Sequence, residues 1–153
     1  MQKITPFLWF DGNAEEAMND YVSIFKNARV LNVSRVNGKV MSVTFELEGQ
    51  RFMGLNGGPQ FKFTEAISLF VNCETQAEVD ELWEKLSQGG AKGRCGWLKD
   101  RYGLSWQIIP AALVKLIGDP DPEKSQAVMQ AMLKMNKIVI EDLQRAYDGR
   151  AAA

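Results

Sequence analysis

The chain has 153 residues, of which 46% are hydrophobic and 24% are charged, and its formal net charge is -1. These values are typical of a soluble globular protein that is long enough to bury one core. Lysine and arginine form no basic block, so we expect no nucleic-acid partner. No apolar run approaches the roughly 18 residues that cross a bilayer, and the N-terminus enters a strand-like run at once, unlike a signal peptide. We therefore expect a cytoplasmic protein without a membrane partner.

The chain contains no histidine. Histidine is the commonest metal ligand and the usual general base near neutral pH. Its absence excludes a Ser-His-Asp triad, a Cys-His pair and a His-ligated zinc site. The two cysteines, Cys73 and Cys95, are too few for a disulfide framework, so we expect free thiols in a reducing compartment. Any catalysis must then use carboxylates, thiols, lysine, tyrosine or backbone groups.

The first part of the chain predicts the order β-α-β-β-β. Asn13 precedes a helical pattern, with Glu16 at the capping-box position. Asn37-Gly38 separates two strand-like runs and is a strong hairpin signal, because both residues tolerate a positive φ. In chain order, the expected elements are a strand over residues 4–10, a helix over 14–25, and strands over 32–36, 39–47 and 51–56.

The same order then starts again. Thr75 is the expected N-cap of a second helix, with Glu78 as its capping-box partner, and Gly89-Gly90 ends that helix. The expected strands of this second set lie over residues 66–71, around 94–99 and over 104–110.

The two sets can be aligned as an internal repeat. Leu8–Phe10 matches Leu69–Val71, an offset of 61 by subtraction of the residue numbers. The last strands match with Arg51–Met53 on Leu104–Trp106. Residue identity between the halves is poor, so the repeat rests on the hydrophobic pattern, and a chance alternation of short elements is the alternative interpretation.

The last third predicts a helical tail. Residues 111–117 form a short helix, Asp121 caps the next one with Pro122 at its first position, and residues 138–147 form another. A Met-rich apolar stripe on this tail must cover either the chain's own sheet or a second subunit. We predict an α+β fold of paired βαβββ modules in a single domain, residues 1–153. Module one covers residues 3–58, module two 64–110 and the helical tail 111–149.

Four groups of residues form recognisable motifs: Ile4–Ala17, Leu55–Pro59 with Phe61, Phe63 and Glu65–Ser68, Cys95–Gln107, and Asp119–Pro122 through Ile138. These motifs resemble the PhnB-like family, which is often labelled 3-demethylubiquinone-9 3-methyltransferase. The resemblance covers nearly the whole chain. It implies membership of the glyoxalase, bleomycin-resistance and dioxygenase superfamily (the vicinal oxygen chelate superfamily), whose members pair two βαβββ modules around a cleft and commonly form homodimers.

The resemblance also implies where a metal would bind in metal-dependent members, on the first and last strands of each module. The matching residues here are Thr5, Gly54, Ala66 and Gln107. None is histidine or glutamate, and the amide oxygen of Gln107 alone does not hold a divalent ion. We therefore predict no metal and no cofactor.

Strand alternation predicts which side chains face the implied cleft. The polar side chains Ser42, Thr44 and Glu46 of the third strand are expected to join this face. The opposite face, with Leu8, Phe10, Met53, Leu55, Ile67, Leu69, Trp106 and Ile108, is expected to pack on the helices. The predicted ligand-pocket residues are Thr5, Phe7, Trp9, Phe52, Asn56, Ser68, Phe70, Ser105 and Gln107.

This aromatic face with a few neutral polar groups is typical of a pocket for a small, largely apolar molecule. Our main hypothesis is a metal-independent protein that binds a small organic molecule. One alternative is an enzyme that uses Glu46 as a base or Cys95 as a thiol. Another is the methyltransferase of the family label, which the first turn, Asp11-Gly12-Asn13, disfavours because it is not the Gly-rich turn of such enzymes.

Each candidate also has a structural interpretation. Trp9 is as well suited to a core or dimer contact as to ligand stacking. Asn56 and Gln107 are suited to hydrogen bonding with neighbouring protein groups. Glu46 is suited to a solvated position at the rim and Cys95 to a structural thiol.

Overall fold

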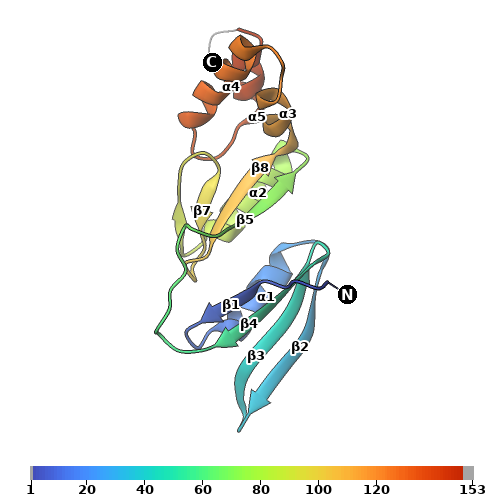
Figure 1. Ribbon diagram of the computed structural model, residues 1–153, viewed down its shortest axis with the longest axis vertical. Coiled ribbons are helices and arrows are strands. Elements are labelled where there is room, and N and C mark those ends of the chain that lie inside the picture. The colour runs from blue at the N-terminus through green and yellow to red at the C-terminus, as the bar shows by residue number, and fades with distance from the viewer. Residues whose placement is uncertain (1, 150–153) are drawn as a thin grey trace. The chain divides into compact units, whose positions relative to one another are not determined.

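The computed structural model describes residues 2–149, which form two compact units with a boundary after Phe63. Each unit has one four-stranded sheet and is described by itself (Figure 1). The observed element order is β-α-β-β-β in both units, followed by three helices, which confirms the predicted repeat and the α+β class. Within residues 2–149, no helix combines the length and apolar character that a bilayer crossing needs.

The first unit packs one helix on one face of its sheet. The strand order is β1-β4-β3-β2, with β1 parallel to β4 and the other neighbours antiparallel. Tyr21 of the helix lies 6.0 Å from Phe45, ring centre to ring centre, and Phe45 stacks on Phe52 at 5.5 Å. The elements are β1 (Phe7–Phe10), α1 (Ala14–Ile24), β2 (Ala28–Val36), β3 (Lys39–Leu47) and β4 (Gln50–Asn56).

The N-terminus of α1 is capped from a distant strand. Asn13 occupies the predicted N-cap position, but its side chain makes no capping hydrogen bond. Asn56, the last residue of β4, accepts a hydrogen bond from the Ala14 backbone N–H at 2.9 Å through Oδ1. Its Nδ2 donates to the Val40 carbonyl at 3.1 Å. Asn56 therefore ties the helix to two strands and satisfies a backbone donor that helix geometry leaves unpaired.

The second unit repeats this plan with shorter strands. Thr75 caps α2 as predicted, since its Oγ1 accepts a hydrogen bond from the Glu78 N–H at 3.2 Å. The strand order is β5-β8-β7-β6, with β5 parallel to β8. The first strand begins at Ser68, two residues later than predicted. The elements are β5 (Ser68–Cys73), α2 (Gln76–Ser87), β6 (Ala91–Lys92), β7 (Trp97–Lys99) and β8 (Ser105–Pro110).

A buried carboxylate fixes the turn between β7 and β8. Asp100 is 5% exposed. It accepts hydrogen bonds from the backbone N–H groups of Tyr102 and Leu104 at 2.9 and 3.0 Å and from the Trp106 indole N–H at 2.9 Å. A buried charge is tolerated only with partners of this kind.

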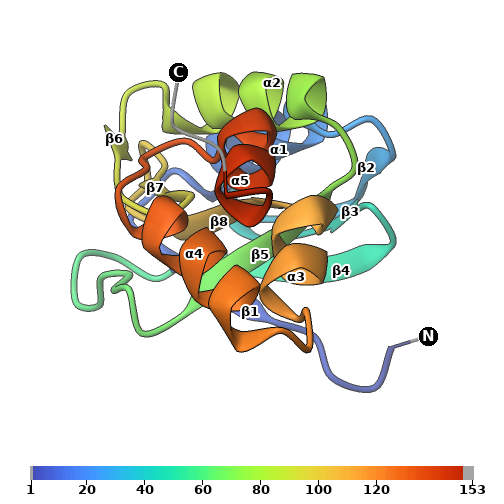
Figure 2. The same ribbon diagram turned by 90° about the horizontal axis from the view of Figure 1, so that it is seen from above.

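The tail forms α3 (Ala111–Ile117), α4 (Pro122–Leu133) and α5 (Ile140–Tyr147), which lie against one another beyond the end of β8 (Figures 1 and 2). Asp121 caps α4 as predicted, and Pro122 stands at its first position. Ile109 of β8 belongs to the apolar cluster of the tail, so the tail completes the core of its own unit. The buried members are Ile109, Leu113, Leu116, Val128, Ile138 and Leu143.

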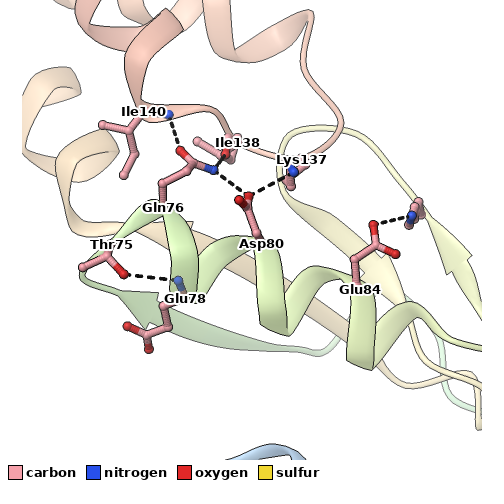
Figure 3. Close-up of polar contacts among 9 residues, drawn as sticks. Thr75, Gln76, Glu78, Asp80, Glu84, Lys137, Ile138 and Ile140 are labelled. Carbon is pink, nitrogen blue, oxygen red and sulfur yellow. Dashed lines mark hydrogen bonds and ion pairs between the residues drawn. The ribbon is translucent and has the colours of Figure 1, made fainter.

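Polar contacts connect the segment between α4 and α5 to the rest of the unit. Gln76 of α2 donates to the Ile138 carbonyl at 2.9 Å and accepts from the Ile140 N–H at 2.7 Å (Figure 3). Lys137 forms an ion pair with Asp80 at 3.0 Å. On the other side of the segment, the backbone N–H groups of residues 95 and 96 donate to the carbonyls of residues 135 and 136, both at 2.8 Å.

Candidate functional site

Each sheet has one face that its helix covers and one face that it does not, and we call the second one the open face. In the first unit, α1 buries the even-numbered side chains of β1 and the odd-numbered side chains of β3. Partners in neighbouring strands project to the same side, so the registers define both faces. The first open face carries Phe7, Trp9, Ser42, Thr44, Glu46, Arg51, Met53 and Leu55.

This register corrects the predicted face of β4. Phe52 and Asn56 were expected beside Phe7 and Trp9, but they lie on the helix side, where Phe52 is 5% exposed. Gly54 lies there too, because a Cβ on it would meet Val43 and Phe10 at 3.0 and 3.2 Å. Their places on the open face are taken by the odd-numbered residues Arg51, Met53 and Leu55.

The error came from a one-residue slip in the internal repeat. Trp9 pairs with Leu55, and Phe70 pairs with Gln107. Since Trp9 matches Phe70 in the repeat, the counterpart of Gln107 is Leu55 and not Gly54. A slip of one residue moves every side chain of a strand to the other face. The two-residue turn at Glu48-Gly49 was the signal that could have prevented it, because such a turn pairs even-numbered residues of β3 with odd-numbered residues of β4.

Trp9 is half-buried and engaged with the loop that follows β4. Its indole N–H donates to the Gly58 carbonyl at 2.9 Å, and its ring meets Phe61 edge-on at 4.9 Å. A Cβ at Gly57 would collide with the indole ring. Trp9 therefore has a structural role in its own unit, and its remaining exposed surface borders the open face.

Glu46 is paired within the sheet. Its carboxylate lies 3.5 Å from the Arg29 guanidinium, and 23% of its side chain is exposed. Arg51 is its register partner on β4. The structure therefore places Glu46 in an ion pair within the sheet.

The second open face confirms the predicted alternation of β5 and β8. Gln107 is half-buried and donates from Nε2 to the Ser68 hydroxyl at 2.9 Å, and Phe70 is 48% exposed. Lys99 forms an ion pair with Glu65, which lowers the pKa of the Glu65 carboxyl. The second open face carries Ser68, Phe70, Trp97, Lys99, Ser105 and Gln107.

Ser105 is the most enclosed polar residue of this face. It is 1% exposed, and within residues 2–149 its hydroxyl oxygen has no hydrogen-bond partner. A buried hydroxyl without a partner costs free energy. Ser105 therefore lies beside the Gln107–Ser68 pair with an unused hydrogen-bonding group.

The two cysteines lie in different surroundings. Cys73 ends β5 and is fully buried, and this burial raises the pKa of its thiol to about 12, with the nearby Glu78 carboxylate as a smaller contribution. Cys95 is half-buried with a φ of 58°, and its backbone N–H donates to Met135. Both are free thiols. Of the two residues, only Cys95 is partly exposed.

The metal positions of the superfamily hold poor ligands. In residues 2–149, no group of three or more His, Cys, Asp or Glu side chains is arranged to hold an ion. The corrected register replaces Gly54 with Leu55, which is apolar. Thr5 precedes β1, Ala66 precedes β5, and the Gln107 amide already bonds Ser68. These side chains do not fit a divalent cation.

Comparison with known proteins gives a consistent picture. The family model for 3-demethylubiquinone-9 3-methyltransferase matches residues 2–109. The structure of a PhnB protein from Bacillus cereus, whose description names the same methyltransferase, is 43% identical with a TM-score of 0.68. The match covers 72% of this chain and 100% of that one. No curated protein matches.

Two more distant structures support the fold alone. Protein PA1353 from Pseudomonas aeruginosa is 20% identical with a TM-score of 0.60, and the match covers 72% of this chain and 98% of that one. The fosfomycin resistance protein FosX from Listeria monocytogenes, solved with Mn(II) and a sulfate ion, is 16% identical with a TM-score of 0.51. That match covers 69% of this chain and 88% of FosX.

Proposed function

This chain belongs to the family described as 3-demethylubiquinone-9 3-methyltransferase, the PhnB-like family of the vicinal oxygen chelate superfamily, and on that premise we propose that it binds a small organic molecule without a metal. The open faces of its sheets provide the binding surface. The observation that carries the proposal is the composition of these faces, which combine aromatic and aliphatic side chains with a few neutral polar groups. Such a composition is typical of small-molecule sites.

Exposed aromatic side chains are the strongest support. Phe7 is 54% exposed on the first open face, and Phe70 is 48% exposed on the second. On each face taken by itself, an exposed apolar patch commonly marks an interaction site. Gln107, Ser68 and Ser105 add hydrogen-bonding groups next to Phe70. A ligand that stacks on the ring and bonds the Ser105 hydroxyl would satisfy both features.

The donor set supports the proposed metal independence. The four superfamily positions provide a threonine, a leucine, an alanine and a glutamine in the corrected register. FosX was solved with Mn(II), so this chain is proposed to differ from that protein in its chemistry while sharing its fold.

A thermal-shift screen of metabolites, with and without added Mg²⁺, Mn²⁺ or Zn²⁺, tests the proposal. A ligand that binds only the native state raises Tm with its concentration, and we expect such shifts without metal. Phe70→Ala and Gln107→Ala should reduce them. A large rise in Tm on addition of a divalent metal alone would contradict metal independence.

The methyltransferase of the family description is the second candidate, and the match over residues 2–109 favours it. Isothermal titration calorimetry with S-adenosylmethionine separates the two candidates. Measurable heat at micromolar concentrations would support methyl transfer, and its absence would favour the binding protein.

We further propose a cytoplasmic homodimer. The two free thiols suit a reducing compartment, and the exposed apolar side chains on both open faces suit a subunit contact. Light scattering coupled to gel filtration measures the molar mass, and a value near the 17.2 kDa of one chain would exclude the dimer.

A further inference from the structure

Arg51 is half-buried, and its guanidinium has no ion-pair partner among the described residues of its own unit. It is the second residue of β4, and its side chain lies on the first open face, opposite Glu46 of β3. In residues 2–149 its guanidinium makes no ion pair and no hydrogen bond. An unpaired guanidinium on this face is available to an anionic partner.

The neighbouring carboxylate does not cancel this charge. Glu46 is the nearest acidic residue in the register, but its ion pair is with Arg29 on the far strand, at 3.5 Å. The row of three side chains across β4, β3 and β2 therefore holds two cations and one anion. Its net charge of about +1 is located on the Arg51 side, next to β1.

Hydrogen bonds from the N-terminal segment reach the backbone around Arg51. Its N–H donates to the Gln2 side-chain oxygen at 3.0 Å, and the Gln50 amide donates to the same oxygen at 3.2 Å. Two residues on, the Met53 N–H donates to the Pro6 carbonyl at 3.0 Å. These bonds place the segment with Thr5 beside Arg51.

Apolar side chains follow directly along the same face. Met53 is two residues from Arg51, about 7 Å along the strand, and its register partner is Phe7, which is 54% exposed. Cation and apolar surface are thus separated by a distance that a molecule of the size of benzoate can span.

We propose that the ligand of this face is a small organic anion. Its carboxylate or phosphate group pairs with the Arg51 guanidinium, and its apolar part packs on Phe7 and Met53. This inference rests on the proposed binding function and adds the chemical class of the ligand. Arg51 then determines specificity for an anion over a neutral analogue, because a guanidinium pairs with such groups through two parallel hydrogen bonds.

The test compares charged and neutral probes on the full chain. Benzoate, phenylphosphonate, inorganic phosphate and the neutral benzyl alcohol are titrated in a thermal-shift assay and by NMR chemical-shift perturbation. We expect benzoate or phenylphosphonate to bind more tightly than benzyl alcohol. In Arg51→Gln this preference should fall about tenfold or more, as the loss of a charge-assisted pair predicts, while benzyl alcohol is unaffected.

Three further variants make the result specific. Arg35→Gln is the matched control, since Arg35 is on the same sheet but pairs with Glu15 of α1 at 2.7 Å; it should leave binding unchanged. Arg51→Lys should retain part of the preference, because the charge remains but the fork is lost. Arg29→Gln should weaken anion binding, because it leaves the Glu46 carboxylate without its partner. Circular dichroism melts show that each variant is folded.

Equal affinity of wild type and Arg51→Gln for every anion of the set, or no binding of any of them, would overturn the proposal. The proposed binding function would survive that result if benzyl alcohol still bound and Phe7→Ala abolished its binding. It would fail separately if no probe, charged or neutral, depended on the open-face aromatic residues.

Discussion

In the first unit, the three strands after the helix have nine, nine and seven residues, whereas in the second unit they have two, three and six. The long strands of the first unit complete a sheet whose covered face is buried by α1 and by Phe63 of the following loop. The short strands of the second unit leave its core incomplete, and the tail helices supply the missing side chains around Ile109. The same β-α-β-β-β order is therefore completed by a longer sheet in the first unit and by added helices in the second.

The N-terminal caps of α1 and α2 also differ between the two units. In the second unit α2 is capped locally by Thr75, whereas in the first unit α1 is capped by Asn56 of β4, 42 residues from Ala14 in the chain. A local cap acts as soon as the helix forms. A cap from a distant strand exists only when the sheet is in place, so it couples helix and sheet.

Removing a tail side chain is expected to have the largest effect. Leu143 is fully buried in the tail cluster, and Leu143→Ala should lower the free energy of unfolding by about 2–5 kcal/mol because it leaves a cavity. Leu133→Ala, at a position 46% exposed on the same tail, should cost less than about 1 kcal/mol. Urea denaturation measures both. Equal costs would mean that the tail does not belong to the core of the second unit.

Changing Asp100 in the turn between β7 and β8 is expected to have the second-largest effect on the free energy of unfolding. Asp100→Ala leaves two backbone N–H groups and the Trp106 indole N–H without their acceptor, and we expect a loss of about 3 kcal/mol. Asp100→Asn keeps one oxygen and should lose roughly half as much. The measurement is the midpoint of urea unfolding. If Asp100→Ala were neutral, the turn between β7 and β8 would not support the second sheet.

The caps provide a matched pair with a smaller effect. Asn56→Ala removes the bonds to Ala14 and Val40 and should cost about 1–2 kcal/mol. Asn13→Ala, at the nominal cap position, should cost less than about 0.5 kcal/mol because that side chain makes no capping bond. Thermal melts followed by circular dichroism compare the two variants. The reverse order would show that Asn13 is the working cap.

The smallest expected effect is on the pH dependence of the free energy of unfolding, and it is absent at neutral pH. The Cys73 thiol has its pKa raised from 9.0 to about 12 by burial. Between these values the unfolded state loses its proton while the native state keeps it, so the free energy of unfolding falls as pH rises above about 9. In Cys73→Ala, the part of this fall in the free energy of unfolding with pH that comes from the thiol should be absent. Urea titrations at pH 8 to 10.5 compare the two proteins, and parallel curves would contradict the burial effect.

Thiol labelling gives an independent measure of the difference in burial between Cys73 and Cys95. We expect Cys95 to react with a disulfide reagent in the native protein, while Cys73 reacts only on unfolding.

Much of the fold could be predicted from local patterns. The turn at Asn37-Gly38, the caps Thr75 and Asp121, and the short helix Ala111–Ile117 all depend on residues that lie close together in the chain. The faces of β5 and β8 were also predicted correctly, because alternation along one strand is itself local.

The candidate site was predicted in part. Phe7, Trp9, Ser68, Phe70, Ser105 and Gln107 lie on open faces as expected, while Phe52 and Asn56 do not. Arg51 was missed because its face depends on the register of β4 against β3. That register is set by a pairing between strands, which a pattern along one strand does not contain.

Hydrophobic periodicity, turn residues and the lack of histidine were enough to determine the β-α-β-β-β order, the repeat and the kinds of chemistry that are excluded, because each is a property of neighbouring residues or of composition. Tertiary structure alone decided that Asn56 caps α1, that the tail completes the second core, and that Arg51 shares a face with Phe7. Those outcomes depend on which strand residues become partners, and the partners are distant in the chain.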